Sequence, residues 1–132
     1  MNRFLDKECN AFLLSPLTLA FVGDTVYDLF VREELVCENN RPVKKLHNIA
    51  SAKVNAKAQA ESAKKLMPYL TEKETEVFKR GRNAHTNHKA KNMSESDYHS
   101  ATGLECLFGY LYLDGQLERL RELFGIINEA DS

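Results

Sequence analysis

Two carboxylates stand in strongly apolar stretches of this sequence and are the first candidates for chemistry. Asp24 lies within AFVGDTVYDLF, and Glu105 lies within ATGLECLFGYLYL. An ionised carboxylate in apolar surroundings is costly unless a cation, an ion pair or hydrogen bonds compensate its charge. Two such groups that converge can share a divalent ion, and their hard oxygen atoms suit Mg²⁺. A site of this kind is suited to the hydrolysis of phosphodiesters.

Other roles for the two acids stay open on the residues alone. Asp24 can cap a neighbouring helix or pair with a buried Arg, and Glu105 can face solvent. Small residues near both acids favour a close approach of two helices. They are Ala20, Gly23, Thr102, Gly103 and Gly109. Asp28 lies one helical turn after Asp24, and Thr102 one turn before Glu105, so both are candidates for contacts that support the metal ligands.

A basic segment, VFKRGRNAHTNHKAKNM over residues 77–93, contains no acidic residue. Arg, Lys and short polar side chains make the usual contacts with phosphates and sugars. Beyond Phe78 the segment has no aromatic ring on which unpaired bases could stack, which favours duplex RNA over a single strand. The candidate RNA-binding residues, two of them from the preceding Lys-rich stretch, are Lys53, Lys57, Arg80, Arg82, Asn83, His85, His88, Lys89 and Lys91.

The distribution of charge along the chain is a second indication of a polyanionic partner. The net charge is only -1, but residues 41–91 hold 13 Lys and Arg against 4 Asp and Glu, while residues 1–40 hold 3 against 7 and residues 92–132 hold 2 against 8. A basic face gathers phosphates by counterion release whatever the total charge of the molecule. An ordinary solvated helix surface explains the same asymmetry equally well.

The elements that must position the two acids are predicted to be helices. Residues 17–36 follow Ser15 and Pro16, a hydroxyl cap before a proline at the first helical position. Apolar residues occupy nearly every side of the first half of this helix, which predicts that this half is buried all round.

The middle of the chain predicts two further helices. Residues 43–67 are rich in Ala and Lys with apolar residues at helical spacing, so we predict one helix that Pro68 ends. Thr71 with Glu74 predicts a capping box, and the short helix that it opens is expected to stop near Gly81.

The last third of the chain predicts an exposed loop followed by two helices. Residues 82–96 have little hydrophobic periodicity, whereas residues 97–114 are apolar on most sides and predict a second buried helix. Residues 116–130 predict a closing amphipathic helix. The expected fold is an all-α orthogonal bundle of five to six helices in one domain, residues 1–132.

Composition excludes several other classes of protein. No run of about 18 apolar residues is present, and the first residues are too polar for the core of a signal peptide, so we expect a cytoplasmic protein. The three cysteines, Cys9, Cys37 and Cys106, form no zinc-site pattern with the histidines, and we expect them to be reduced.

The two acidic stretches and their order resemble the ribonuclease III family. LTLAFVGDTVYDLF is similar to the signature helix of its catalytic domain, roughly ERLEFLGDAVL, and ATGLECLFGYLYLDG is similar to its second acidic helix, roughly DxFEAxxGAxYLD. LHNIASAKVNAKAQA resembles the helix that connects them. The resemblance covers about residues 15–125. The RGRNA stretch and the TGxExLxGYLYL pattern most resemble the mini-ribonuclease III subgroup, a stand-alone catalytic domain without a double-stranded-RNA-binding domain.

This resemblance implies a ribonuclease III catalytic-domain-like bundle and a homodimer. It also implies an endoribonuclease that uses Mg²⁺ to cleave double-stranded RNA to 5′-phosphate and 3′-hydroxyl ends, and that matures the ends of large-subunit (23S) ribosomal RNA precursor. The family's metal-binding and catalytic acids fall on Asp24 and Glu105. A ribosomal protein bound to the precursor is a further candidate partner.

Two acids of the larger family members are replaced in this chain. Ala20 stands four residues before Asp24, and Thr102 stands three residues before Glu105, where those enzymes carry Glu and Asp. We therefore expect fewer protein ligands and more water around the metal. Two other functions stay open, namely a double-stranded-RNA-binding module that has lost catalysis and a helical domain that binds other proteins.

Overall fold

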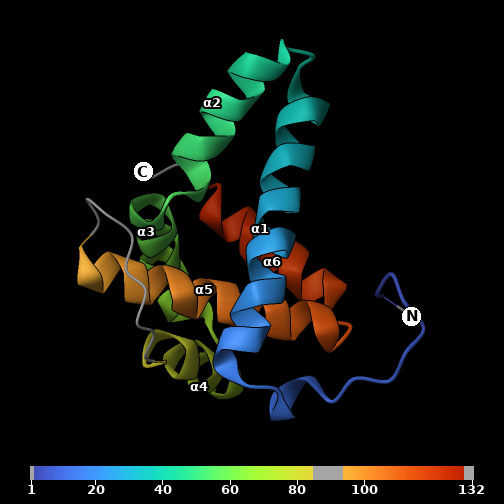
Figure 1. The fold of residues 1–132 in the computed structure, drawn as a ribbon, viewed down its shortest axis with the longest axis vertical. Coiled ribbons are helices and arrows are strands. Elements are labelled where there is room, and N and C mark those ends of the chain that lie inside the picture. The colour runs from blue at the N-terminus through green and yellow to red at the C-terminus, as the bar shows by residue number, and fades with distance from the viewer. Residues whose placement is uncertain (1, 85–93, 130–132) are drawn as a thin grey trace.

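Helices make up all the regular structure of the described part of the chain. The structure is a computed structural model that describes residues 2–84 and 94–129, and Figure 1 shows how its helices are arranged. The helices are α1 (Pro16–Glu38), α2 (Val43–Val54), α3 (Ala56–Leu66), α4 (Glu72–Arg82), α5 (Glu95–Leu113) and α6 (Leu117–Ile127), with short 3₁₀ segments η1 (Ala11–Leu13) and η2 (Met67–Tyr69). The predicted all-α bundle of five to six helices is confirmed.

Capping side chains start the helices where the sequence predicts. The Ser15 hydroxyl accepts a hydrogen bond from the Thr18 backbone N–H at 3.3 Å, directly before Pro16. At the start of α4, Thr71 and Glu74 form both hydrogen bonds of a capping box, at 2.9 and 3.1 Å. These caps satisfy backbone N–H groups that have no partner inside a helix.

The prediction of one continuous helix over residues 43–67 is wrong. Asn55 interrupts it with an extended backbone (ψ 163°), and its side-chain oxygen accepts a hydrogen bond from the Ala58 N–H at 2.9 Å, which starts α3 as a new helix. Asn competes with the helical backbone for hydrogen bonds and therefore favours such a cap. The break allows α2 to pack on α1 while α3 packs on α5.

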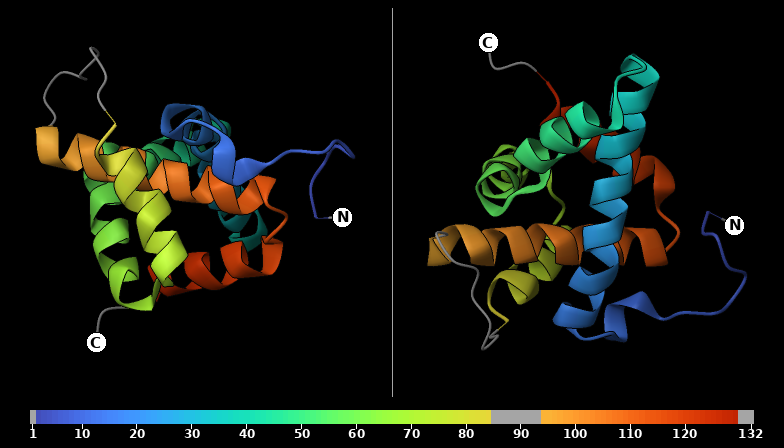
Figure 2. Two further views of the ribbon diagram at one scale, coloured as in Figure 1. Left: turned by 90° about the horizontal axis from the view of Figure 1, so that it is seen from below. Right: turned by 45° about the horizontal axis from the view of Figure 1, so that its top comes forward.

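The buried helix α5 is the centre of the fold, and α1, α3 and α4 pack around it. The helices α1 and α5 cross with their backbones in contact, and the right view of Figure 2 shows α5 running across α1. A Cβ atom on Gly23 would lie 1.6 Å from the Glu105 carbonyl oxygen, and one on Gly109 would lie 1.9 Å from the Leu19 carbonyl oxygen. Only glycine fits at these two positions, as the small residues of the sequence predicted for the two helices.

The first half of α1 is not buried on all sides, contrary to the sequence prediction. Leu19, Gly23 and Tyr27 face the core, but the Phe21 side chain is 80 % exposed, and Leu17 and Leu29 are also exposed. Helix α5 packs on α1 together with α2 and α4, but the face of α1 that includes Phe21 stays exposed in the single chain. None of the described helices is long and apolar enough to cross a membrane.

The short helix α4 packs closely on α5. It ends at Arg82, one residue past the predicted end at Gly81. A Cβ on Gly81 would lie 2.4 Å from the Cys106 Cβ, so this glycine serves the contact between the helices. Cys106 is buried there, and it forms no disulfide, nor do Cys9 and Cys37, as predicted.

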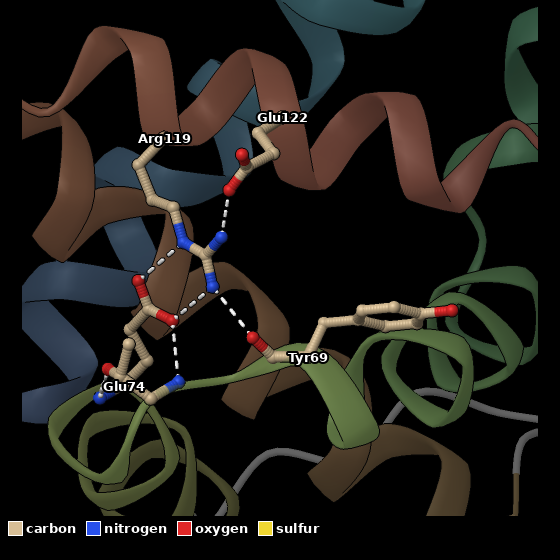
Figure 3. Close-up of polar contacts among 5 residues, drawn as sticks. Tyr69, Glu74, Arg119 and Glu122 are labelled. Carbon is tan, nitrogen blue, oxygen red and sulfur yellow. Dashed lines mark hydrogen bonds and ion pairs between the residues drawn. The ribbon is translucent and has the colours of Figure 1, made fainter.

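A buried ion pair connects α4 to α6. The Arg119 guanidinium donates two hydrogen bonds of 2.8 Å to the Glu74 carboxylate and a third to the Tyr69 carbonyl oxygen, and it also contacts Glu122 (Figure 3). Burial alone would raise the pKa of Glu74, but the hydrogen bonds from Arg119 and Thr71 and the guanidinium charge outweigh it and lower the pKa. The pair therefore stabilises the fold at neutral pH and loses this effect as the pH falls through the lowered pKa of Glu74.

Loss of Arg119 is expected to destabilise the fold strongly. Arg119→Met leaves Glu74 buried without its charge partner, so the free energy of unfolding at pH 7 should fall by about 3 to 5 kcal/mol. Urea unfolding followed by circular dichroism measures this change. The matched control is Arg121→Met, because Arg121 pairs with Glu118 on the exposed side of the same helix and should change stability by less than about 1 kcal/mol. Equal effects of the two variants would contradict the expectation.

Candidate metal centre and nucleic-acid interface

The two acids singled out by the sequence meet at the crossing of α1 and α5. Gly23 lies against the backbone of Glu105, and Asp24 is the next residue of α1. The close approach brings the two side chains together, and Asp24 and Glu105 share a hydrogen bond. The crossing therefore brings together two acids that are 81 positions apart in the sequence.

The two carboxylates differ in their exposure to solvent. Glu105 is the only residue between Ala101 and Leu111 of α5 that is not buried, and it is half-buried. Asp24 is exposed, so the prediction of apolar surroundings holds for Glu105 and is wrong for Asp24. The pair lies where a buried helix reaches the surface, and Asp24 is accessible from outside.

The charge of the Asp24 and Glu105 carboxylates favours binding of a proton or a cation. Burial, the charge of Asp24 and its hydrogen bond together raise the pKa of Glu105 to about 8, while a hydrogen bond from Gln59 acts in the opposite direction. Within the described part of the chain neither Asp24 nor Glu105 forms an ion pair with Lys or Arg. At neutral pH the pair must therefore hold a proton or bind a cation from solution.

The donor set fits a hard divalent cation that keeps most of its water. The site offers carboxylate oxygens from Asp24 and Glu105, and among the described residues no three His, Cys, Asp or Glu side chains lie close enough to share a metal. Mg²⁺ is commonly bound through one or two carboxylates and several waters. Soft or borderline metals prefer His and Cys ligands. The role of the two acids as metal ligands stays a prediction.

Sequence reasoning missed a third residue of the site, Gln59. It lies on the inward face of α3 with its side chain 2 % exposed, and it hydrogen-bonds Glu105. The other buried positions of this face are Ala56, Ala63 and Leu66. A lone amide among small and apolar residues at helical spacing is the signal that was available in the sequence.

The two residues expected to support the ligands have other partners. The Asp28 carboxylate forms an ion pair of 3.1 Å with Arg32, one turn further along α1. The Thr102 hydroxyl donates a 3.0 Å hydrogen bond to the Tyr98 carbonyl oxygen within α5. The structure thus gives Asp28 and Thr102 local roles along their own helices, and a contact of either with a bound metal stays a prediction.

Two of the predicted RNA-binding lysines lie at the junction of α2 and α3. Lys53 is in the last turn of α2 and Lys57 in the first turn of α3, on either side of Asn55, and both are exposed. Lys53 also contacts Glu34 of α1 at 3.5 Å. Lys57 and Gln59 lie on the same helix, α3.

The remaining candidates belong to the end of α4 and the segment after it. Arg80 donates hydrogen bonds to the carbonyl oxygens of Phe12 and Leu14, so it fastens the segment before α1. Arg82 and Asn83 were predicted to lie in a loop, but Arg82 ends α4 and Asn83 is its cap. His85, His88, Lys89 and Lys91 lie outside the described residues. Contact of this set with RNA stays a prediction.

Comparison with known proteins identifies close relatives of the whole chain. Residues 17–116 match the sequence pattern of the Ribonuclease III domain. A protein of Thermoanaerobacter sp. named Mini-ribonuclease 3 is 47% identical over 122 residues, which are 92% of this chain and 85% of that protein. The Mini-ribonuclease 3 of Staphylococcus aureus is 40% identical over 89% of this chain and 92% of its own length.

A solved structure has the same fold. The X-ray crystal structure of a protein from Fusobacterium nucleatum superposes with a TM-score of 0.80 at 29% sequence identity, over 88% of this chain and 94% of that chain. The agreement extends over nearly the full length of both proteins. It supports the arrangement of helices that places the two carboxylates side by side.

The raised pKa of Glu105 makes the free energy of unfolding of the metal-free protein depend on pH. The unfolded chain releases the Glu105 proton near pH 4.5 and the folded chain near pH 8, so stability falls as the pH rises between these values. Glu105→Gln carries no such charge. In EDTA it should be more stable than the parent at pH 8.5, on the order of 1 to 3 kcal/mol, and the difference should narrow toward pH 5. Urea unfolding at the two pH values tests this, and a pH-independent difference would contradict it.

Proposed function

The chain belongs to the ribonuclease III family and is an endoribonuclease, and on this premise we propose that it cleaves double-stranded RNA with Mg²⁺ held by Asp24 and Glu105. The observation that carries the proposal is the uncompensated carboxylate pair at the crossing of α1 and α5. Enzymes of this family generally use a divalent metal and act on double-stranded RNA. A purely RNA-binding role is less favoured, because the relatives are named as ribonucleases.

The proposed mechanism needs no nucleophilic side chain. Asp24 and Glu105 would hold the divalent ion, and the chemistry it would supply there is the activation of water and the neutralisation of charge on the scissile phosphate. Of these two residues, Asp24 is exposed to solvent and Glu105 is half-buried on α5. Glu105 must lose its proton before its carboxylate can bind a cation. The affinity of the site for a metal therefore depends on pH.

Duplex RNA would be held by positively charged side chains of α2, α3 and α4. Exposed Lys57, together with Lys53 at the α2–α3 junction, can neutralise phosphates, and Arg82 with Asn83 at the end of α4 can contact phosphates and sugars. His85, His88, Lys89 and Lys91 are assigned to the same role from the sequence alone. A basic surface of this kind predicts affinity that falls as the salt concentration rises.

Two observations support double-stranded RNA as the substrate. They are the family and the lack of aromatic rings for base stacking beyond Phe78 in residues 77–93. We propose cleavage to 5′-phosphate and 3′-hydroxyl ends in the cytoplasm, with the precursor of 23S ribosomal RNA as the substrate. The similarity to proteins named Mini-ribonuclease 3 supports this proposal at the level of the subgroup. A ribosomal protein bound to the precursor remains a prediction from the sequence.

Removal of either carboxylate is expected to abolish cleavage and to spare RNA binding. Asp24→Asn and Glu105→Gln should each lower the rate of cleavage of a structured precursor by more than about 100-fold in Mg²⁺, because each removes one of two protein ligands. The affinity for duplex RNA in EDTA, measured by gel shift, should change by less than about threefold.

The matched control is Asp114→Asn, which removes an exposed acid at the end of α5 and should cleave at the parent rate. Mapping the product ends by primer extension tests the proposed precursor. Full activity of Asp24→Asn in Mg²⁺ would contradict the proposed site.

We also propose that the protein acts as a homodimer through the uncovered face of α1. Enzymes of the ribonuclease III family typically act as dimers. Phe21 stands 80 % exposed on this face, next to a groove of about 590 Å³ between α1, α6 and the N-terminal segment. The groove is lined by apolar side chains that include Phe4, Val26, Leu29 and Tyr112. A large exposed apolar surface of this kind is suited to self-association.

Replacement of Phe21 by a charged residue is expected to give a monomer. Phe21→Glu places a charge in the proposed interface, so the molar mass from light scattering should fall from that of two chains to that of one. Thermal stability should hold within a few degrees, because Phe21 has few contacts within its own chain. Tyr69→Glu, at an exposed aromatic on the α3–α4 connection, is the control that should stay dimeric. A Phe21→Glu protein that remains dimeric would contradict the proposed interface.

A further inference from the structure

The inward face of α3 carries one polar residue where the pattern of the helix calls for an apolar one. The buried positions of α3 are Ala56, Gln59, Ala63 and Leu66, each about one helical turn after the one before. Gln59 is 2 % exposed. Burial of an amide without partners costs on the order of 1 to 3 kcal/mol, so packing alone does not explain this residue.

The partner of the Gln59 amide is the Glu105 carboxyl group. Helix α3 packs on α5, and the Gln59 side chain hydrogen-bonds Glu105 from the side of α3 while Asp24 approaches from α1. An ionised carboxylate only accepts hydrogen bonds, so the NH₂ group of Gln59 is the donor. Glu105 is thus held between a neutral amide and a second carboxylate, on two different helices.

The position of Gln59 is fixed by the start of its own helix. Asn55 breaks the chain between α2 and α3 and caps the Ala58 N–H, so Gln59 lies in the first turn and a half of a new helix. If the chain continued as one straight helix, the direction of α3 would follow α2, which packs on α1. The break directs the Gln59 side chain toward α5.

We propose that Gln59 is a positioning residue for the metal site and that its amide holds the Glu105 carboxylate in the orientation that meets the cation together with Asp24. This proposal rests on the proposed metal-binding function and deepens it. A Glu side chain has three rotatable bonds, and an ion held by only two carboxylates gains from any contact that orders them beforehand. A neutral amide provides this order and adds no further negative charge to the pair.

The positions equivalent to the additional acids of larger family members are Ala20 and Thr102, both buried here. Neither supplies a charged ligand, and the Thr102 hydroxyl is engaged with the Tyr98 carbonyl oxygen. Gln59 reaches Glu105 from a third helix and is therefore the contact left to orient it. Groups that orient metal ligands in this way commonly contribute 10- to 100-fold to affinity.

The test is metal binding by a variant that keeps the shape of Gln59 without its amide. Gln59→Met preserves the length and most of the volume of the side chain and removes the hydrogen bond. Titration of the RNA-free protein with Mn²⁺, followed by the electron paramagnetic resonance signal of free Mn²⁺, measures affinity without activity. We expect the dissociation constant to rise by about 10-fold or more relative to the parent. Gln59→Asn, which keeps the amide but is one methylene too short, should show the same loss.

Two further variants separate the proposal from its alternatives. Ser62→Ala removes a partly buried hydrogen bond from the same helix, the one between the Ser62 and Tyr27 hydroxyls, and should bind Mn²⁺ with the parent affinity. If Ser62→Ala weakens binding as much as Gln59→Met does, the effect comes from general loosening of α3 and the proposal is overturned.

Asp24→Asn tells a failure of this proposal from a failure of the metal site. Parent affinity in both Gln59 variants, with weak binding by Asp24→Asn, would overturn the role of Gln59 and leave the metal site standing. Parent affinity in Asp24→Asn as well would overturn both. In cleavage assays, Gln59→Met should raise the Mg²⁺ concentration for half-maximal rate by a factor similar to its loss of Mn²⁺ affinity.

Discussion

The contact between the backbones of α1 and α5 is the constraint on which the rest of the structure depends. Two glycines, Gly23 and Gly109, let the helices approach until the backbone of one touches that of the other. At ordinary helix spacing, of about 8 to 10 Å between axes, side chains separate the backbones. Here the closeness itself sets how near the backbones of Asp24 and Glu105 lie, and the orientation of the Glu105 side chain is left to its contact with Gln59.

The other helices hold this crossing in place from the opposite sides of α5. Helix α4 packs through Gly81 and Gly103, where a Cβ atom would collide with Cys106 and Phe78 respectively. Helix α6 is tied to α4 by the buried pair of Arg119 and Glu74, whose strength comes from two short hydrogen bonds in a partly dry environment. Helix α3 closes the remaining side and delivers Gln59. The half-exposed carboxylate of Glu105 thus stands on the stretch of α5 from Ala101 to Leu111, in which every other residue is buried.

Much of this arrangement could be predicted from the sequence, because its signals are local. The Ser15 cap, the capping box of Thr71 and Glu74 and the apolar stretch around Glu105 each act within a few residues, and all three are present in the structure. The break at Asn55 was missed because Ala and Lys on both sides have high helix propensity, and only the tertiary contact of α3 with α5 shows that a new helix must begin there.

The errors at the site have a different cause. Apolar residues all round α1 predicted burial, but a sequence cannot tell an apolar face that enters the core from one that remains free for another surface. Phe21 belongs to the second kind. Gln59 was missed because its importance depends on a contact with a residue 46 positions away. Arg80, whose contact with RNA stays a prediction, also fastens the chain near Phe12 and Leu14, a role that no local pattern reveals.

The placement of Phe21 and Asp24 on one straight helix has a geometric consequence. The two residues are three positions apart on α1, which at 23 residues is a rod of about 35 Å. In the proposed dimer, symmetry then relates not only the two interfaces but also the two carboxylate pairs, and the vector between the pairs is set by a single rigid element. The stagger between cuts on opposite strands of a duplex would be a property of helix geometry, insensitive to which bases lie between them.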